Sequence, residues 1–371
     1  MNARFDLTTP AYQLRTRGVA QRIYPEGFDG ASVATAVSAA MAAVGEKTRN
    51  GTKKIVVGLV PFDVDAEAVF YMPEDVEFST DYPKVSTPKD ERHNVFEIHG
   101  DDSPAYRKNV AEALKRIESG DLDKVVLARS VTVDFNTPIN VDAVYARLCA
   151  RNGNAYVYRI DLPNGHDERP AVLLGASPEL VLRSENGKIR STPLAGSIPR
   201  AADAVADEDV ARTLLNSKKD LVEHSLVVQA VGETFRQFAD GVEVPSKPQL
   251  VETPVIWHLG TDITGMLREN VSPIALAYAL HPTPAVGGWP KEAARKAIAE
   301  LEGFDRGFYA GLIGWMDDEG NGEWVLTLRC GIVSGNTATV FAGAGIVAGS
   351  DPEKEHTETG TKLRTFINAL G

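Results

Sequence analysis

The stretch FAGAGIVAGSDPEKEHTETGTKL, residues 341–363, brings together residue types that could bind ligands of both charges. The small residues Gly343, Ala344 and Gly345 would let a ligand approach backbone N–H groups, which bind anions. A glycine bulge within a strand explains the same residues without a ligand. The pattern GAGIVAG does not match the dinucleotide fingerprint, because its spacing is G-x-G-x-x-x-G and no second parallel strand follows.

The residues that follow predict a helix with carboxylates on one face. Glu355, Glu358 and Lys362 have the spacing i, i+3 and i+7, which places them on one side of a helix. Neighbouring carboxylates suit a cation, but acidic residues near a helix start are also favoured by the helix dipole. Lys362 could equally be a surface ion-pair partner of Glu358. The stretch therefore raises the question of which ligand needs an anion site beside a cation site.

A further carboxylate lies in a separate predicted helix, NSKKDLVEHSLVVQAV. Glu223 is followed at i+3 and i+4 by the apolar residues Leu226 and Val227, so its carboxylate is expected on an apolar face. Such a carboxylate needs a partner, which is either a cation or a lysine or arginine side chain. Glu223 together with Glu358 would form an oxygen-only site, which suits Mg²⁺ with retained water. The 7 histidines show no spacing typical of a zinc site.

Three more residues could take part in chemistry. Lys124 opens the predicted strand KVVLAR, where an inward-facing amine would lose hydration and become a competent base. The alternative is a solvated lysine at a strand end. Glu179 lies between Ser-Pro and an apolar strand, where burial would raise its pKa and let it act as an acid. Arg329 is predicted in the middle of an apolar strand, where it needs a carboxylate partner from the protein or from a ligand.

Composition limits the class of protein. The 371 residues are 43% hydrophobic and 24% charged, enough to bury the core of one large domain or two ordinary ones. The net charge of -12 argues against a nucleic-acid partner, because phosphate binding needs a basic surface. The 2 cysteines, Cys149 and Cys330, fit buried thiols in a reducing compartment. No apolar signal core and no membrane span is expected, so we predict a cytoplasmic protein.

Apolar periodicity and turn residues indicate which elements carry these side chains. Ser103 is suited to cap a helix that Pro104 begins and Gly120 ends. Strands are predicted at 155–161, 171–183, 188–192, 310–316, 323–333 and 337–347. Helices are predicted at 139–152, 207–239, 272–281, 290–302 and 352–369, the last capped by Ser350 or Asp351. Short turns such as SENGK and DDEGNG favour antiparallel hairpins, so the expected class is α+β with large antiparallel sheets.

The first part of the chain has its own pattern. Residues 1 to about 72 predict strands around one helix, which falls within the uncharged stretch 30–45. Residues 73–103 are polar and rich in Pro, Asp and Glu, which is typical of a long surface connection.

Taken in order, several motifs resemble those of the chorismate-utilising enzymes. They are KVVLARS, LLGASPELVL, TPLAGSIPR, KKDLVEHSLVVQ, TPVIWHLGTDI, LHPTPAVGGWP, FDRGFYAGLIGW, GEWVLTLRC and the stretch from Phe341 to Leu363. The resemblance covers about residue 100 to the end, and so many long motifs in order make it specific. It implies one domain over 1–371, with packed antiparallel β-sheets inside and helices outside. Residues 1–100 would complete that fold, and 101–371 would form the catalytic core.

The resemblance also implies roles for individual residues. Chorismate is a dicarboxylate, which answers the question of paired anion and cation sites. Mg²⁺ would bridge Glu223, Glu358 and the ring carboxylate, and Glu355 would hold metal-bound water. Lys124 would deprotonate a water that adds at C2, and Glu179 would protonate the C4 hydroxyl as it leaves. The residues expected to contact substrate are Gly196, His258, Ala285, Arg329, Gly343, Ala344, Gly345 and Lys362.

Within the family the chain resembles isochorismate synthases most. Ala195 replaces the nucleophilic lysine of aminodeoxychorismate synthases, and Ala285 replaces the threonine typical of ammonia-using and salicylate-forming relatives. His356 and Ser225 depart from close relatives and could alter the surroundings of the metal. Salicylate synthase is the alternative activity, and an inactive chorismate-binding paralogue is a third hypothesis. The resemblance implies a monomer whose product feeds aryl-siderophore (2,3-dihydroxybenzoate) or menaquinone synthesis.

Overall fold

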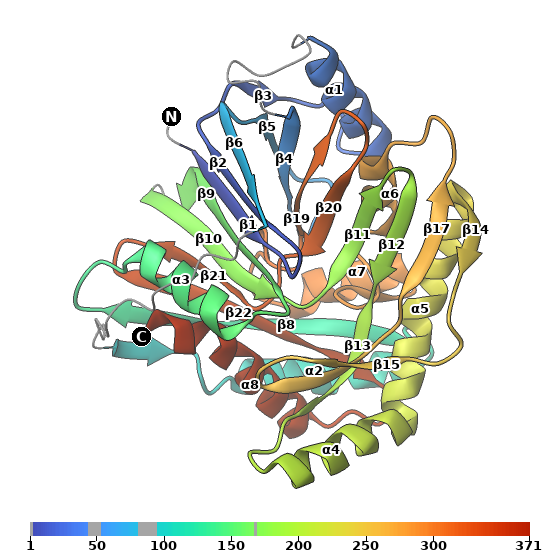
Figure 1. Cartoon of the computed structure of the whole chain (residues 1–371). Helices are drawn as coiled ribbons and strands as arrows, with labels where there is room; N and C mark the ends of the chain where they lie inside the picture. The colour runs from blue at the N-terminus through green and yellow to red at the C-terminus, as the bar shows by residue number, and fades with distance from the viewer. Residues whose placement is uncertain (1–2, 44–52, 81–94, 167–168) are drawn as a thin grey trace.

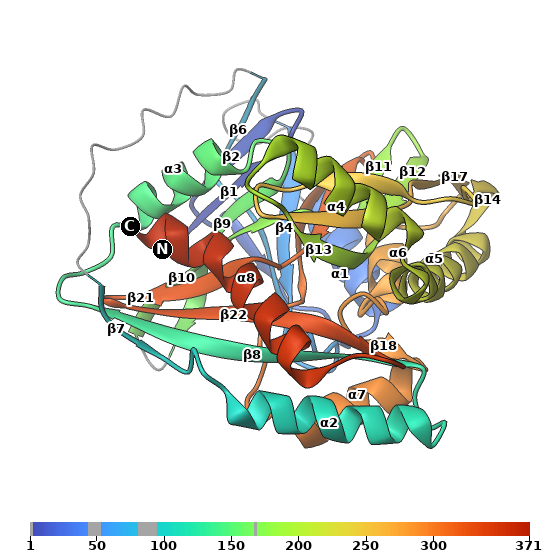
Figure 2. The same cartoon turned by 90° about the horizontal axis from the view of Figure 1, so that it is seen from below.

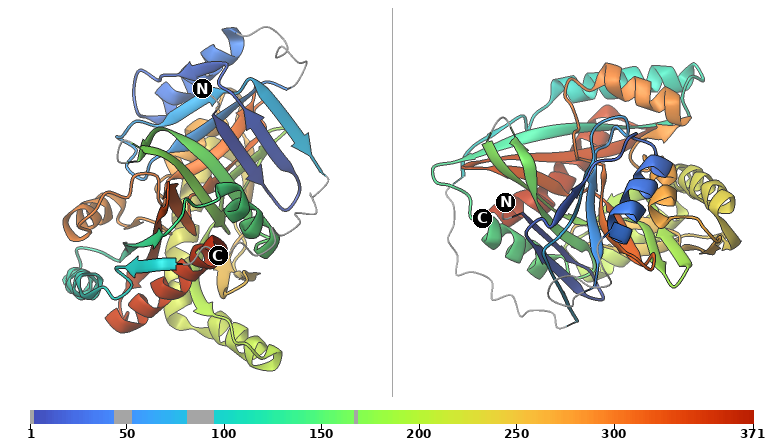
Figure 3. Two further views of the ribbon diagram at one scale, coloured as in Figure 1. Left: turned by 90° about the vertical axis from the view of Figure 1, so that its left-hand side faces the viewer. Right: turned by 90° about the horizontal axis from the view of Figure 1, so that it is seen from above.

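The computed structural model describes residues 3–43, 53–80, 95–166 and 169–371. Antiparallel sheets occupy the centre of the molecule and helices lie around them (Figures 1 and 3). The predicted α+β class is therefore confirmed, as is the single domain with helices outside the sheets. Among the described helices, none has the length and apolar content needed to cross a membrane.

Two large sheets share the core of the molecule. The ten-stranded sheet has the order β18-β8-β22-β21-β10-β9-β1-β2-β6, with β7 paired to β8. Its strands are β1 (Arg4–Thr8), β2 (Gln13–Arg17), β6 (Asp75–Ser79), β7 (Val95–His99), β8 (Lys124–Phe135), β9 (Tyr156–His166), β10 (Arg169–Ser177), β18 (Gly288–Trp289), β21 (Cys330–Ser334) and β22 (Thr337–Val347). The nine-stranded sheet has the order β14-β17-β12-β11-β20-β19-β4-β5-β3. Its strands are β3 (Gln21–Ile23), β4 (Ile55–Val60), β5 (Val69–Met72), β11 (Leu180–Glu185), β12 (Lys188–Thr192), β14 (Ala239–Glu243), β17 (Ile263–Leu267), β19 (Leu312–Asp317) and β20 (Gly322–Leu326).

A small third sheet and the helices complete the fold. The three-stranded sheet contains β13 (Leu194–Pro199), β16 (Ile256–Gly260) and β15 (Gln249–Glu252). Figure 2 shows α8 lying across β22 and β8, while α2 runs along the outside of the same sheet. The helices are α1 (Gly30–Ala43), α2 (Pro104–Glu118), α3 (Val141–Arg151), α4 (Ala204–Asn216), α5 (Lys218–Phe238), α6 (Pro273–Leu280), α7 (Lys291–Leu301) and α8 (Pro352–Leu370).

Helix starts follow the predicted capping residues. The Ser103 side chain accepts a hydrogen bond from the Tyr106 N–H and Pro104 is the first residue of α2, as predicted. At α8 the cap is Asp351, whose carboxylate accepts from two backbone N–H groups, so Ser350 is not the cap. Caps of this kind satisfy backbone donors that a helix start leaves free.

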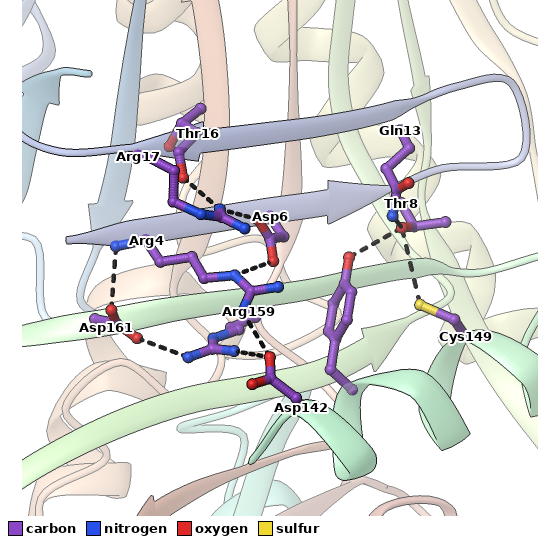
Figure 4. Close-up of polar contacts among 11 residues, drawn as sticks. Arg4, Asp6, Thr8, Gln13, Thr16, Arg17, Asp142, Cys149, Arg159 and Asp161 are labelled. Atoms are coloured by element: carbon purple, nitrogen blue, oxygen red, sulfur yellow. Dashed lines mark hydrogen bonds and ion pairs between the residues drawn. The ribbon is translucent and has the colours of Figure 1, made fainter. Parts of the chain in front are cut away.

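The N-terminal strands belong to both large sheets: β1, β2 and β6 lie in one, and β3, β4 and β5 in the other. Figure 4 shows how ion pairs attach β1 to its neighbours. The buried carboxylate of Asp6 pairs with Arg4 at 2.6 Å and with Arg17 at 2.9 Å. Arg4 also reaches Asp142 on α3 at 2.6 Å. The described part of residues 1–100 is thus built into the central sheets.

Four predicted elements were wrong in their extent. The helix predicted at 207–239 is two helices, because the Ser217 side chain accepts from the Asp220 N–H and starts α5 anew. The run 171–183 breaks at residues 178–179, where the chain passes from the ten-stranded to the nine-stranded sheet. The run 323–333 breaks at residues 327–329 for the same reason. Residues 73–103 hold strands β6 and β7 as well as connections; residues 81–94 of this segment lie outside the described part of the chain.

Candidate active site

A cavity of about 430 Å³ collects nearly all of the predicted site residues. This volume falls within the roughly 300–1,000 Å³ of typical small-molecule sites. Its wall includes residues of β13 and β16 of the small sheet, of β22, and of helices α5 and α8. The predicted residues on the wall are Glu179, Gly196, Glu223, His258, Ala285, Arg329, Gly343, Gly345, Glu355, Glu358 and Lys362.

Two predicted residues are not on the cavity wall. Ala344 is 1% exposed and lies between two wall residues on β22, and side chains alternate between the faces of a strand. Its side chain therefore does not line the cavity, and the predicted approach of substrate to the Ala344 backbone stays a prediction. Lys124 is fully buried one layer behind the wall, with its Cε close to the position that a side chain at Gly345 would take. The alternative of a solvated lysine at a strand end is excluded.

Strand β22 presents a free edge to the cavity because its neighbours differ in length. β8 pairs with it along Thr337–Val347, whereas β21 pairs only along Thr337–Val340. Beyond this point the Lys362 ammonium donates a hydrogen bond to the Gly343 carbonyl at 2.9 Å. A Cβ at Gly345 would lie 2.3 Å from Oε1 of Glu223. The glycine is therefore needed so that Glu223 can approach the strand; no bulge is seen here.

Each of the three predicted metal carboxylates is paired with a lysine. Glu223 on α5 lies 2.9 Å from the Lys124 ammonium. On α8, Glu355 lies 2.9 Å from Lys219, and Glu358 lies 2.6 Å from Lys362. The Glu358–Lys362 pair is mostly buried. The sequence left open whether this pair lies on the surface, and the structure shows that it does not.

The Lys124 ammonium is poorly satisfied in spite of this ion pair. The angles at the Lys124–Glu223 contact do not meet hydrogen-bond geometry, and the ammonium finds no other hydrogen-bond partner among the described residues. A buried polar group without a partner is costly. Such a group is expected to interact with something that enters the site, such as water or a ligand.

The carboxyl groups in the cavity differ in their tendency to ionise. Burial raises the pKa of Glu355, and the nearby Glu358 raises it further against the opposing effect of Lys219. Burial also acts to raise the pKa of Glu358, but its ion pair with Lys362 and a hydrogen bond from Ser197 outweigh burial and lower it. Two neighbouring carboxylates thus have pKa values shifted in opposite directions.

Glu179 has the properties predicted for an acid. It is 3% exposed and lies where the chain passes from β10 to β11. Burial raises its pKa to about 8, against the smaller effects of a hydrogen bond with the Leu194 backbone and of the nearby cations Lys124, Arg329 and Lys362. The group is therefore mostly protonated at neutral pH and has a proton to donate.

Arg329 does not lie in mid-strand, which corrects the prediction. It occupies the crossing from β20 to β21 with a φ of 49°. Residues other than glycine seldom adopt this backbone conformation. Its guanidinium contacts Nε2 of His258 at 3.1 Å, and no carboxylate partner is found for it among the described residues. Burial lowers the pKa of His258 far below its usual value, with Arg329 and Lys362 adding to the effect. A neutral His258 can thus accept from Arg329, which leaves the cation available to an anionic ligand.

Several wall residues were missed by sequence reasoning. Ser197 donates a hydrogen bond to Glu358 at 3.0 Å, and Lys219 is the partner of Glu355. The rings of Tyr309 and Phe341 are stacked with centroids 5.3 Å apart. Lys219 could have been found, since it precedes Glu223 by one helical turn. His356 and Ser225, by contrast, do not line the cavity.

The acidic residues suit Mg²⁺ in their chemistry. Glu223, Glu355 and Glu358 supply only oxygen, the donor that Mg²⁺ prefers, and Mg²⁺ usually keeps several waters. In the described part of the chain, no group of three or more His, Cys, Asp or Glu is drawn together to hold a metal. Two protein carboxylates with water and a ligand oxygen would satisfy the ion without such a group, so the residues fit this mode of binding.

Comparison with known proteins defines the class. The family described as chorismate binding enzyme matches residues 49–371. The chain therefore belongs to the chorismate binding enzymes.

Two relatives of high similarity are isochorismate synthases by name. The chain is 40% identical to isochorismate synthase DhbC of Bacillus subtilis, over 99% of this chain and 93% of the relative. It is 38% identical to isochorismate synthase EntC of Escherichia coli K12, over 99% and 95%. A crystal structure of DhbC from Bacillus anthracis, provisionally named a 2,3-dihydroxybenzoate-specific isochorismate synthase, superposes with a TM-score of 0.91 at 36% identity. The superposition covers 100% of this chain and 96% of the Bacillus anthracis chain.

Proposed function

We propose that this chain is an isochorismate synthase, which converts chorismate to isochorismate by adding water at C2 with loss of the C4 hydroxyl. The observation that carries the proposal is Glu179, a buried acid with a pKa of about 8 on the cavity wall, together with the buried Lys124 amine directly behind that wall, which has no hydrogen-bond partner among the described residues. A site that only bound chorismate would have no need of a buried acid and a buried amine. The near full-length similarity to isochorismate synthases supports the same activity.

In this proposal Glu179 gives its proton to the C4 hydroxyl as that group leaves. Lys124, in its neutral amine form, takes a proton from the water that attacks C2 and becomes the ammonium. Because Lys124 lies behind Gly345 and touches Glu223, its amine has to turn from that carboxylate toward the cavity. General acid–base catalysis of this kind contributes roughly 10²–10⁴-fold to a rate.

We infer that Glu223 and Glu358 would hold Mg²⁺, with Glu355 contributing through water. When bound, the metal would polarise and orient the substrate carboxylate. Arg329 and Lys362 lie on the same wall and supply positive charge for the substrate carboxylates. A Cβ at Gly196 would lie 2.9 Å from the Asp220 Cβ, and one at Gly343 would lie 3.0 Å from the Tyr309 hydroxyl, so these two glycines let other wall residues pack closely.

The test is incubation of the purified protein with chorismate, with Mg²⁺ or with EDTA, and chromatographic separation of the products. An isochorismate peak that requires Mg²⁺, without salicylate, is the expected result. Salicylate together with pyruvate would contradict the proposal and favour salicylate synthase, in spite of Ala285 on the cavity wall. Bound but unchanged chorismate would favour an inactive paralogue.

The pathway that consumes isochorismate is proposed only as a choice of two. The product would feed either 2,3-dihydroxybenzoate for an aryl siderophore or menaquinone.

A further inference from the structure

Lys219 has no assigned part in the proposed reaction, yet it lies in the middle of the acidic residues. It belongs to α5, one turn before Glu223, and its ammonium crosses to α8. There it donates a hydrogen bond to Oε1 of Glu355 at 2.9 Å. The Glu355 side chain is 3% exposed, whereas that of Lys219 is 38% exposed. The lysine thus reaches from the protein surface to a carboxylate that has almost no contact with solvent.

The charges of this cluster balance without a metal. Its three ion pairs, Lys124–Glu223, Lys219–Glu355 and Lys362–Glu358, contain equal numbers of ammonium and carboxylate groups. A divalent cation that entered alone would add two positive charges where each of these three carboxylates already has a counter-ion. Nearby like charges in a poorly solvated site repel strongly. The metal alone is therefore expected to bind weakly.

A dicarboxylate ligand changes this balance. Its two negative charges would offset the two charges of the metal, so the two bind more favourably together than either does alone. Such mutual support is a coupling free energy between two ligands, and it is reciprocal. Lys124 and Lys362 are buried and have proposed roles toward water and substrate, whereas Lys219 contacts only a metal ligand in this cluster.

We propose that Lys219 is a built-in counter-ion that competes with Mg²⁺ for Glu355 and makes metal binding depend on the dicarboxylate substrate. This inference rests on the proposed function, because it takes the three carboxylates as the metal site. Lys219 acts through Glu355 and is a positioning residue. Its removal should make the metal bind more tightly on its own.

The experiment is calorimetric titration of the full-length protein with MgCl₂ alone. The variants are Lys219→Met and, as a matched control, Lys218→Met, which removes the same charge from the exposed neighbouring residue. For a partly exposed ion pair we expect Lys219→Met to lower the Kd of Mg²⁺ about two- to fivefold. Lys218→Met should leave the Kd of the wild type unchanged. A measurable affinity in Lys219→Met where the wild type shows none would support the inference equally.

Other outcomes would overturn it in distinguishable ways. Equal Kd values for Lys219→Met and Lys218→Met would mean that Mg²⁺ affinity depends only on the net charge of the protein and not on the Lys219–Glu355 ion pair. Weaker binding in Lys219→Met would mean that the lysine organises the ligands instead of competing with the metal. No Mg²⁺ binding by any of the three proteins, even with chorismate present, would contradict the proposed metal site itself and the inference with it.

A second titration tests the dependence on substrate. In a Glu179→Gln background, in which turnover is expected to be strongly slowed, chorismate should tighten Mg²⁺ binding. Adding Lys219→Met should reduce this tightening, because the metal alone already binds better. An unchanged tightening would contradict a role of Lys219 in the coupling.

Discussion

The ammonium of Lys124 lies 2.9 Å from Oε1 of Glu223, with side-chain exposures of 1% and 11%. The proposed base and a proposed metal ligand are therefore direct neighbours in the protein interior. Because this amine is buried without a hydrogen-bond partner among the described residues, removing it should affect catalysis more than ligand binding.

We predict that Lys124→Met lowers kcat for isochorismate formation by about 10²- to 10⁴-fold. The Kd for chorismate should change much less, since Arg329 and Lys362 still supply charge to the ligand. Steady-state kinetics and calorimetric titration measure the two quantities. Lys115→Met, an exposed lysine on α2, is the control and should match the wild type. Full turnover in Lys124→Met would show that another group accepts the proton.

The pKa of Glu179 predicts a pH profile. If the protonated carboxyl donates to the leaving hydroxyl, the rate should fall as pH rises through about 8, where the proton is lost. Glu179→Gln should lose about 10²- to 10⁴-fold in kcat, and its residual rate should not fall as pH rises through about 8. A wild-type rate that stays constant to about pH 10 would rule out Glu179 as the acid.

The same group predicts a pH-dependent stability. Its pKa is higher in the folded than in the unfolded chain, so the stabilising effect of its proton is complete below about 4.5 and is lost as pH rises to about 8. The amide of Glu179→Gln cannot ionise. As pH rises from about 4.5 to about 8, the melting temperature of Glu179→Gln should therefore increase relative to that of the wild type. The difference should then stay constant above about pH 8. Calorimetry at several pH values tests this, and a constant difference would argue that Glu179 is ionised throughout.

Gly345 should be sensitive to the smallest substitution. The Cβ of Gly345→Ala would come within 2.3 Å of Oε1 of Glu223 and 3.0 Å of the Lys124 Cε, so both side chains must move. We predict at least a tenfold loss of kcat and weaker Mg²⁺ binding, roughly the cost of a misplaced group. Gly303→Ala is the control, because a Cβ there meets nothing within 4 Å. Equal activity of the two variants would refute the close approach as a requirement.

A buried ion pair outside the cavity should matter for folding. Arg306 and Glu302 are each 3% exposed and lie 2.5 Å apart. Arg306 also donates to the carbonyls of Val126 and Val286, two wall residues. Arg306→Met would leave the Glu302 carboxylate buried and unpaired, which costs about 3–5 kcal/mol. Denaturant unfolding measures this loss, and a change below about 1 kcal/mol would contradict it.

Much of the site was accessible from the sequence because local patterns carry it. The spacing of Glu355 and Glu358 predicted only that they share one helix face, and the apolar neighbours of Glu223 predicted an inward carboxylate. The family resemblance brought the three together, and the structure places all three on one cavity. The capping sequence at Ser103 likewise gave the start of α2. These features depend on contacts within one or two turns of the chain.

Other features depend on tertiary structure and were not predicted. Apolar flanks around Arg329 indicated one strand, but the chain has to cross between the two large sheets there. The same crossing occurs at Glu179. The strands β6 and β7 were missed because their sequences are rich in charge, which is common for short strands at sheet edges. The pairing of Lys219 with Glu355 joins two helices far apart in sequence, and no local pattern encodes it.

The most direct test of the account is turnover of chorismate by the wild-type protein with Mg²⁺ in oxygen-18 water, followed by separation and mass spectrometry. If water adds at C2 while the C4 hydroxyl leaves, isochorismate from the earliest time points should carry one oxygen-18 atom. Isochorismate without the label would contradict the proposed roles of Lys124 and Glu179, because the hydroxyl would then have moved within the substrate. Absence of isochorismate would contradict the proposed function as a whole.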